Sequence, residues 1–356
     1  MAKVPPMLEG GRLVAGFLRA RARGRPFILS HLVTGRCNAR CPTCMWRMED
    51  VAGGGLEAQT AGELDTTAVE ELYRQAARAG LVQLVVWGGE PTLRRDLPRL
   101  LWGAKEAGLL VTLISNGHLL GRRWPELRGS VDTLILSVDD LGEAHDQMRG
   151  IPGLFARLEM LVGRLAEDPL KPRLLLNTVL SAANPGALER VAPLAKRWGA
   201  GLYFCPMETG QMQSEGFDGR MADLALPADE LRRAAAGALR LKAAGYPLLS
   251  TERYLRLLER DPELTRYTCR VPRAILTIEA DGSVRHCLRR DRPLASYEQI
   301  AGGAGLEAFY RSPRYREMAR EAESCTACNN PDVVETSWLW DLRPAMLRKV
   351  LALASL

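Results

Sequence analysis

The sequence lacks a segment that would cross a membrane or direct secretion. No stretch approaches the roughly 20 consecutive apolar residues that a transmembrane helix needs. Residues 1–27 scatter basic residues along their length, whereas a secretory signal places an apolar core after a short basic start. Disulfides are typical of small secreted domains, and this chain has 356 residues and no such signal. We therefore expect a cytoplasmic protein with reduced cysteines.

The body of the chain also lacks an excess of positive charge. The formal net charge is +6, but six basic residues against Glu9 give residues 1–26 a charge of +5. Residues 341–356 contribute +2, which leaves residues 27–340 at −1. Nucleic-acid-binding domains carry a basic face. The sequence therefore predicts no nucleic-acid partner.

Both basic ends are amphipathic, because apolar residues recur at helical spacing among the arginines. These residues are Leu13, Val14, Phe17 and Leu18 at one end, and Met346, Leu347, Val350 and Leu351 at the other. One interpretation is that both helices dock on the body of the protein. The other is peripheral contact with an anionic membrane, which attracts basic amphipathic helices. The sequence leaves both interpretations open.

Between residues 27 and 245, short β-branched or leucine-rich runs alternate with longer amphipathic stretches. The expected strands are 27–34, 81–88, 109–115, 133–138, 173–180 and 201–207. The expected helices are 66–79, 96–107, 152–166, 187–198 and 227–244. Asp65 or Thr67 is expected to cap the first helix, with Glu70 completing a capping box. Serial strand–helix units predict an α/β fold with a parallel sheet, either open or closed into a complete or partial barrel.

The alternation ends near residue 245, and a small cysteine-bearing module follows. Residues 274–279 and 283–287 flank Ala280-Asp281-Gly282, and an Asp-Gly pair is typical of a tight hairpin turn. We divide the chain into a basic amphipathic segment (1–26), the strand–helix body (27–245), a cysteine-bearing domain (246–335) and a basic amphipathic helix (336–356).

Seven of the eight cysteines fall into two groups, and the first is Cys37, Cys41 and Cys44. Three thiolates directly after the first expected strand would hold a 4Fe-4S cluster with one iron left free for a substrate or cofactor. Zinc is the alternative, but a zinc site takes four ligands, and His31 is the only imidazole near this loop.

This loop resembles that of the radical S-adenosylmethionine (SAM) superfamily, in which Cys-x3-Cys-x2-Cys follows the first strand. The resemblance implies a partial (β/α)6 TIM-like barrel and a cluster whose fourth iron binds the amino and carboxylate groups of SAM. Thr43 departs from the aromatic residue that is usual in the family. Trp46 is the expected substitute beside the adenine.

Further matches to the family lie in order at the ends of later strands. Gly88, Gly89, Glu90 and Pro91 close the second expected strand and resemble the family's motif near the ammonium group of SAM. The other expected SAM contacts are Ser115, Asn116, Ser137, Asp139 and Asn177. In relatives these positions surround the methionine carboxylate and the ribose hydroxyls.

The second group is Cys269, Cys287, Cys325 and Cys328. Four thiolates from a hairpin and a Cys-x2-Cys turn could hold structural zinc or a fully ligated 4Fe-4S cluster. The spacing resembles the Twitch module, a shortened SPASM domain, and the resemblance implies one auxiliary 4Fe-4S cluster.

Four more residues near the expected strand ends are candidates for chemistry. Cys205, the eighth cysteine, is a candidate hydrogen donor, although a lone cysteine is more often an inert apolar residue. Glu208, His145 and Asp146 are candidate proton acceptors, although residues of these types in such places are more often ordinary surface residues.

The resemblance implies a radical SAM oxidoreductase or transferase that cleaves SAM to a 5′-deoxyadenosyl radical and abstracts a hydrogen atom from its substrate. The auxiliary cluster would accept an electron in an oxidation. We rank a small-molecule or lipid substrate above a peptide, because no added domain of the kind that captures leader peptides precedes the barrel. A peptide-crosslinking or epimerising enzyme is the first alternative, and a non-catalytic zinc-binding or electron-transfer protein is the second. A reducing partner such as flavodoxin or ferredoxin is expected.

Overall fold

The structure is a computed structural model. It describes residues 6–44, 62–207, 223–262, 264, 267–285, 295–297, 300, 305–325, 328, 330–343 and 346. For residues 6–9 it describes the backbone alone.

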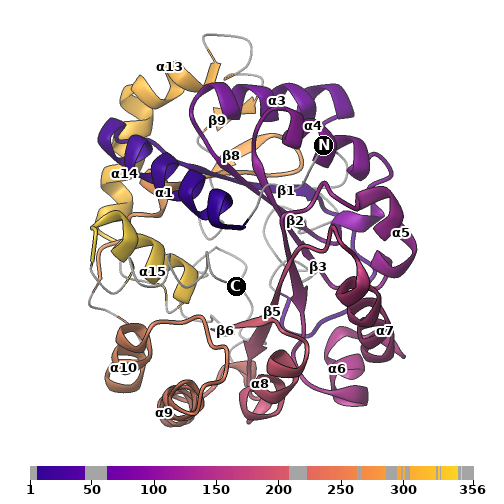
Figure 1. Cartoon of the computed structure of the whole chain (residues 1–356). Coiled ribbons are helices and arrows are strands. Elements are labelled where there is room, and N and C mark those ends of the chain that lie inside the picture. Colours follow the sequence, from indigo (N-terminus) through magenta and orange to yellow (C-terminus); the bar gives the residue numbers. More distant parts are fainter. Residues whose placement is uncertain are drawn as a thin grey trace.

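Strands alternate with helices through the first two thirds of the chain, as the sequence predicts (Figure 1). The strands are β1 (Ile28–Thr34), β2 (Gln83–Gly88), β3 (Leu110–Ser115), β4 (Thr133–Ser137), β5 (Arg173–Leu180) and β6 (Gly201–Pro206). Each pairs in parallel with its neighbour in sequence. Because parallel strands point the same way, the loops that follow all six strands meet at one end of the sheet.

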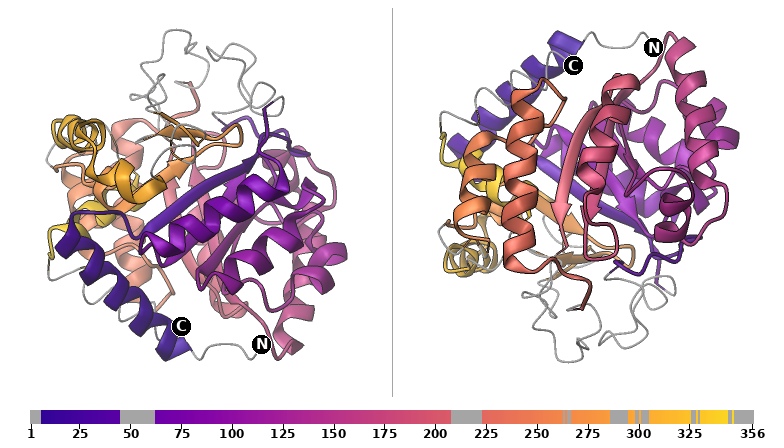
Figure 2. Two further views of the ribbon diagram at one scale, coloured as in Figure 1. Left: turned by 90° about the horizontal axis from the view of Figure 1, so that it is seen from above. Right: turned by 90° about the horizontal axis from the view of Figure 1, so that it is seen from below.

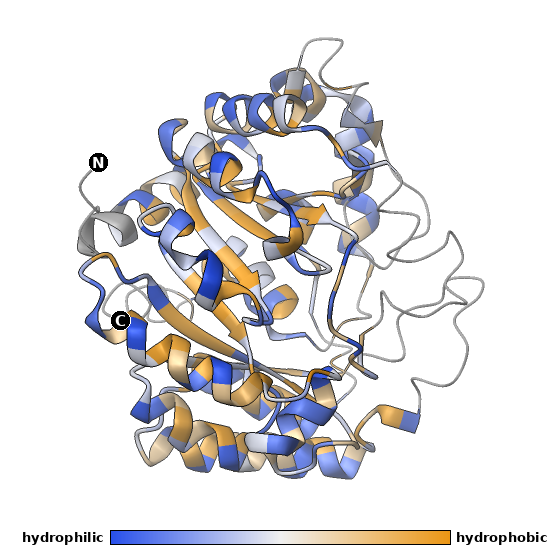
Figure 3. Ribbon diagram, turned by 90° about the vertical axis from the view of Figure 1, so that its right-hand side faces the viewer, coloured by the Kyte–Doolittle hydropathy of each residue, from blue (hydrophilic) through white to orange (hydrophobic). Residues whose placement is uncertain are grey.

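Helices follow the strands and cover the sheet. They are α3 (Thr66–Arg78), α4 (Leu97–Glu106), α5 (Leu120–Leu127), α6 (Gly142–Arg149), α7 (Leu154–Glu167), α8 (Ala187–Arg197) and α9 (Ala228–Ala243). Figure 3 shows mostly hydrophobic strands surrounded by helices that carry both hydrophobic and hydrophilic residues. The core lies between these layers, with fully buried pairs such as Leu29 beside Leu84 and Leu136 beside Leu176 in register.

The C-terminal hairpin extends the same sheet from its other edge. Strand β7 (Ile275–Ile278) pairs in parallel with β1, and β8 (Ser283–Arg285) and β9 (Ala295–Ser296) continue antiparallel. Among the described residues, nine strands form one sheet in the order β6-β5-β4-β3-β2-β1-β7-β8-β9. The sheet stays open between β6 and β9, consistent with the expected partial TIM-like barrel (Figure 2).

The remaining helices pack beside the C-terminal hairpin and beside α9. They are α10 (Glu252–Arg260), α11 (Val271–Ala274), α13 (Gly305–Arg311), α14 (Pro313–Glu323) and α15 (Pro331–Trp340). Helix α10 contacts both α9 and α15.

Helix α1 (Pro6–Arg23) docks on the body of the protein. Phe17 is buried in a small cluster with Phe27 and Trp340, and Arg21 Nε donates a 2.7 Å hydrogen bond to the Trp340 carbonyl. This contact agrees with the docking interpretation of the basic N-terminus, and membrane contact finds no support here. No helix in the described part of the chain combines the length and apolarity that spanning a membrane requires. Residues 347–351 lie outside the described residues.

Candidate functional site

The three cysteines of the first group lie in the loop that leaves the C-terminal end of β1. Cys37, Cys41 and Cys44 are all half-buried, and none of them forms a disulfide within the described part of the chain. Burial raises the pKa of Cys37 to about 11, and the nearby Glu90, Cys44 and Cys41 act in the same direction. Among the described residues, no three Cys, His, Asp or Glu side chains are placed to hold one metal ion. Each cysteine of a cubane binds a different iron, so this ligand set stays a prediction.

Gly88 and Gly89 let the end of β2 press against this cysteine loop. Gly89 N donates to Thr34 O at 2.8 Å, and Glu90 N donates to Arg36 O at 2.7 Å. A Cβ at Gly89 would lie 2.1 Å from the Arg36 oxygen, a distance that no side chain tolerates. The glycines are therefore required for packing against the loop, a reason that the sequence analysis missed. Their contact with SAM stays a prediction.

Glu90 is buried behind the strand ends and organises them. Its carboxylate accepts hydrogen bonds from Ser115 Oγ and Asn116 N, each at 2.8 Å, and from Thr92 N at 3.1 Å. Burial raises the pKa of Glu90, against the opposing effect of these hydrogen bonds. Pro91 begins the short 3-10 helix η1 (Pro91–Leu93). Glu90 thus fixes the two neighbouring residues that were expected to contact SAM.

Asn116 connects the end of β3 to the cysteine loop. Its Nδ2 donates to Asn38 Oδ1 at 2.8 Å, and its Oδ1 accepts a hydrogen bond from His118 N at 2.9 Å. Asn38 stands directly after Cys37. The polar residues at this strand end therefore hold the first cysteine in place.

Asp139 and Arg149 form a buried ion pair that reaches Cys41. The Asp139 carboxylate, which is 0% exposed, lies 2.8 Å from Arg149 Nε and accepts a hydrogen bond from Val179 N at 3.0 Å. Arg149 Nη1 donates to Cys41 Sγ at 3.7 Å, and Arg40 N donates to Arg149 O at 2.8 Å. Burial raises the pKa of Asp139, and Arg149 opposes that shift. Sequence reasoning missed Arg149, because it lies in a short polar helix with no recognisable pattern.

Ser137, Asn177 and Cys205 lie side by side on the last three parallel strands. Ser137 on β4 is in register with Asn177 on β5, and the Cys205 thiol on β6 donates to Asn177 Oδ1 at 3.5 Å. The structure therefore brings the candidate hydrogen donor next to a residue expected to contact SAM. Glu208 and Trp46 lie outside the described residues.

His145 and Asp146 both form hydrogen bonds within the protein, and His145 is not the surface residue that the sequence analysis offered as the alternative. His145 is buried, its Nδ1 accepts a hydrogen bond from Asp139 N at 3.2 Å, and burial lowers its pKa to about 3. Asp146 accepts hydrogen bonds from Gly153 N and Phe155 N at 2.6 and 2.8 Å and so stabilises the start of α7.

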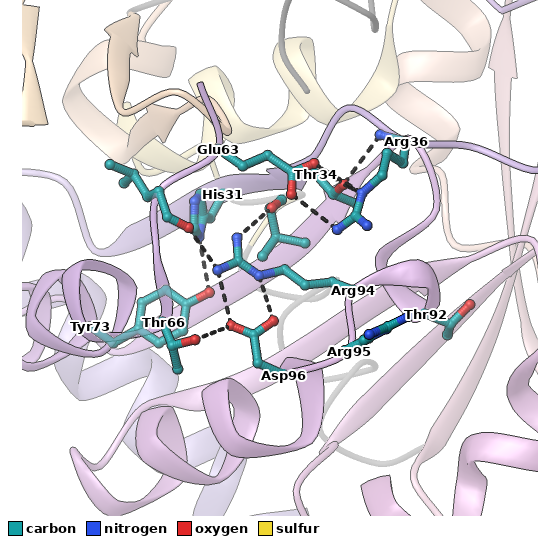
Figure 4. Close-up of polar contacts among 12 residues, drawn as sticks. His31, Thr34, Arg36, Glu63, Thr66, Tyr73, Thr92, Arg94, Arg95 and Asp96 are labelled. Atoms are coloured by element: carbon teal, nitrogen blue, oxygen red, sulfur yellow. Dashed lines mark hydrogen bonds and ion pairs between the residues drawn. The ribbon is translucent and has the colours of Figure 1, made fainter. Parts of the chain in front are cut away.

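A polar network fixes β1 to the segment before α3 (Figure 4). Arg94 donates to Val33 O at 2.9 Å and to Leu64 O at 2.8 Å, and it pairs with Asp96 at 2.8 Å. Glu63 pairs with Arg36 and accepts from Thr34 Oγ1. The network therefore fixes the end of β1, where the cysteine loop begins, through contacts that do not involve Glu90.

His31 belongs to the covered face of β1 and not to the cysteine loop. It is 0% exposed, and its Nδ1 lies 2.9 Å from the hydroxyl of Tyr73 on α3. Burial, together with the charge of Arg94, lowers the pKa of His31 to about 3. His31 is thus not placed to complete a zinc site with the three cysteines.

Three of the four cysteines in the second group gather near α15. Cys269 and Cys328 are buried, and Cys325 is half-buried. Tyr267 OH accepts a 3.1 Å hydrogen bond from Cys328 N. Burial raises the pKa of Cys269, and the Ser337 side chain forms a hydrogen bond with its thiol. Cys287 lies outside the described residues, so the complete ligand set stays a prediction.

Comparison with known proteins gives three findings. Residues 32–180 match the sequence model of the Radical SAM superfamily. The chain is 33% identical over 185 residues to an AdoMet-dependent heme synthase of Methanosarcina barkeri, covering 50% of this chain and about half (49%) of the synthase. It is 27% identical over 323 residues to the PqqA peptide cyclase of Rhizobium meliloti, covering 86% of this chain and 80% of the cyclase.

The fold is similar to that of Streptococcus suis SuiB, whose crystal structure was determined bound to the precursor peptide SuiA. The TM-score is 0.60 at 15% sequence identity, and the match covers 86% of this chain and 70% of SuiB. At that identity the likeness shows the fold alone.

Proposed function

Because this chain belongs to the radical SAM superfamily of enzymes, we propose that it modifies a peptide by hydrogen-atom abstraction. The observation that carries the proposal is the loop of Cys37, Cys41 and Cys44. It leaves β1 at the end of the sheet where all the other parallel strands end. Catalytic sites of α/β barrels lie at this end.

The residues of this loop suit a 4Fe-4S cluster. Three cysteines, with no fourth cysteine beside them in the part of the chain that the structure describes, would leave one iron for SAM. When bound, the cluster supplies the electron that cleaves SAM and releases the 5′-deoxyadenosyl radical. The guanidinium of Arg149 beside Cys41 Sγ provides a positive charge for a thiolate. The donor set and its surroundings therefore fit the group that the family binds.

The neighbouring strand ends position the cysteine loop from three directions. Glu90 follows β2 and bonds the Arg36 carbonyl, Asn116 follows β3 and bonds Asn38, and Arg149 ends α6 and bonds Arg40 and Cys41. Hydrogen bonds that are at least partly shielded from water are stronger than exposed ones, so these contacts favour one arrangement of the loop. Ser137 and Asn177, which have partly exposed side chains, remain for contacts with SAM.

A peptide is the substrate class that the long alignments support best. The match to the PqqA peptide cyclase covers most of both chains, whereas the match to the heme synthase covers about half of each. SuiB, which shares the fold, was crystallised with a precursor peptide. This support changes the ranking made from the sequence, which placed small molecules and lipids first. The relatives are enzymes, which disfavours the non-catalytic alternative.

An auxiliary 4Fe-4S cluster on Cys269, Cys287, Cys325 and Cys328 is part of the proposal. Cys269, Cys325 and Cys328 lie near one another, and two of them are buried. A fully ligated cluster at this place would accept an electron when the peptide is oxidised.

The proposal is tested with anaerobically purified protein, SAM and dithionite. We expect 5′-deoxyadenosine formation that requires Cys37, Cys41 and Cys44, with Cys205→Ala as a variant that keeps the seven predicted ligands. Peptides encoded beside the gene should stimulate the reaction and lose hydrogen atoms or form a crosslink by mass spectrometry. SAM cleavage by the Cys37→Ala/Cys41→Ala/Cys44→Ala variant would refute the assignment of the cluster. Modification of a small molecule and not of peptides would refute the substrate class.

A further inference from the structure

A basic cleft lies between α10 and α15 and is lined by none of the strand-end residues that form the site above. Its volume is about 730 Å³, and binding pockets commonly have volumes of about 300–1,000 Å³. Tyr267 and Trp338 line it with largely buried aromatic rings. The cleft thus offers an apolar floor inside a polar rim.

Arginines dominate the charge of this cleft. Four arginines line it against two carboxylates, namely Arg253, Arg256, Arg260 and Arg343 against Glu252 and Asp341. Both carboxylates already have arginine partners, since Glu252 lies 3.6 Å from Arg256 and Asp341 lies 3.1 Å from Arg270. The positive charge of the cleft is therefore in excess.

Three of these arginines remain for a ligand. Among the residues that the structure describes, Arg253, Arg260 and Arg343 have no carboxylate partner, and all three are exposed. The Arg253 guanidinium lies over the Trp338 ring, 5.0 Å from its centre. Stacking on an aromatic ring leaves the N–H groups of a guanidinium free for a carboxylate. Residues 27–340 have a net charge of −1, so this excess is a local feature.

A second cleft of about 340 Å³ adjoins the first, because Asp341 lines both. Arg21, Arg270 and Arg273 line this second cleft together with Glu323. Thr268 lines the first cleft and Arg270 lines the second. The two residues next to Cys269 in the sequence thus line different clefts, and together we call the two clefts the arginine groove.

We propose that the arginine groove binds an acidic segment of the peptide substrate. This inference rests on the proposed peptide-modifying function and adds a docking site whose residues are separate from those of the cysteine loop. Two adjoining clefts suit an extended chain, whose side chains alternate between opposite sides. Carboxylates on one side of that chain would meet Arg253, Arg260 and Arg343.

The test measures binding to the anaerobically purified holoenzyme by fluorescence anisotropy. The probe is a fluorescein-labelled peptide of alternating Glu and Gly, about ten residues long and therefore about 33 Å when extended. The control peptide has Gln in place of Glu. We expect binding of the Glu peptide alone, and we expect it to weaken as salt screens the charges.

Two matched variants locate the binding. Arg253→Gln/Arg260→Gln/Arg343→Gln should weaken binding about tenfold or more, because the three ion pairs expected with the peptide are removed. Arg19→Gln/Arg122→Gln/Arg197→Gln removes the same charge from exposed sites on α1, α5 and α8, and it should leave the affinity unchanged. Circular dichroism checks that both variants are folded.

The outcomes separate this inference from the proposed function. Equal affinity of both variants for the Glu peptide, or no binding at low salt, overturns the inference whether or not peptides are modified. Loss of flavodoxin binding in the groove variant with unchanged peptide binding also overturns it, because the groove would then receive an electron donor. For a peptide that is modified, the groove variant should raise KM and leave kcat unchanged.

Discussion

At the scale of single residues, the cysteine loop depends on polar side chains that lie far away in sequence, at the ends of two strands and of helix α6. Glu90, Asn116 and Arg149 each contact a different part of the loop. The sequence identifies Glu90 and Asn116 through their place at strand ends, and the structure adds hydrogen bonds within the protein to the predicted contact with SAM, which stays a prediction. Glu90 is 1% exposed and faces neighbouring residues of the protein. Which atom a buried carboxylate meets depends on tertiary packing, which a motif does not reveal.

Arg149→Gln should destabilise the protein strongly, because it leaves the Asp139 carboxylate buried without its cation. Breaking a buried ion pair typically costs about 3–5 kcal/mol. The free energy of unfolding, from urea denaturation under anaerobic conditions, measures the effect. The matched variant Arg149→Gln/Asp139→Asn removes both charges and should recover much of the loss. If the single and double variants are equally destabilised, the ion pair has no part in stability.

The two buried histidines should make the free energy of unfolding fall in acid. The pKa values of His31 and His145 are lowered to about 3 from 6.5. Between these values the unfolded chain binds more protons than the folded chain, so stability is lost as pH falls below about 6.5. Each histidine should contribute up to about 1.4 kcal/mol per pH unit in this window.

Urea denaturation between pH 7 and pH 5 measures this slope. His31→Asn keeps a polar partner for Tyr73 and should flatten the slope by the contribution of one histidine. His118→Asn, at a partly exposed site, should flatten it less. An unchanged slope in His31→Asn would mean that His31 titrates alike in the folded and unfolded chains.

At the scale of elements, short-range sequence patterns predict the alternating strands and helices of the sheet. They miss some side-chain partners and a short polar helix. Asp65 caps α3 as expected, accepting a hydrogen bond from Ala68 N at 2.8 Å. Glu70 does not complete a capping box, because its carboxylate pairs with Arg99 on α4 instead. Helix α6 was not predicted, since only His145 and Met148 are buried on it and it has no apolar stripe.

Helix α1 docks on the body of the protein through one face, and substitutions at two neighbouring residues of α1 test this contact. Phe17 is 5% exposed, and its ring centre lies 5.3 Å from that of Phe27 and 6.1 Å from that of Trp340. Phe17→Ala should lower the free energy of unfolding by about 3–5 kcal/mol, the usual cost of removing a buried ring. Leu18 is 52% exposed, so Leu18→Ala should change stability by no more than about 0.5 kcal/mol. Similar effects of the two variants would show that α1 does not dock through this face.

At the scale of the whole molecule, one open sheet connects both cysteine groups. The first group follows β1, and Cys269 comes shortly before β7, which pairs with β1 in parallel. The sequence predicts the site at the strand ends, because serial strand–helix units place those ends together. It does not predict the pairing of β7 with β1, because the two strands are far apart in the chain and carry no shared pattern. The first predicted cluster thus lies after the end of β1, and Cys269 of the second lies before the start of the neighbouring strand β7.

The last prediction concerns the iron, sulfide and zinc content of the protein. Anaerobically purified protein should contain about eight irons and eight sulfides per chain, as two cubane clusters require. Cys269→Ala/Cys328→Ala should reduce iron to about four, because two of the four expected ligands of the second cluster are lost. Cys205→Ala changes a cysteine outside both groups and should keep about eight. Four irons and one zinc in the unchanged protein would instead assign the second group to a zinc site, and the auxiliary cluster would then have to be withdrawn.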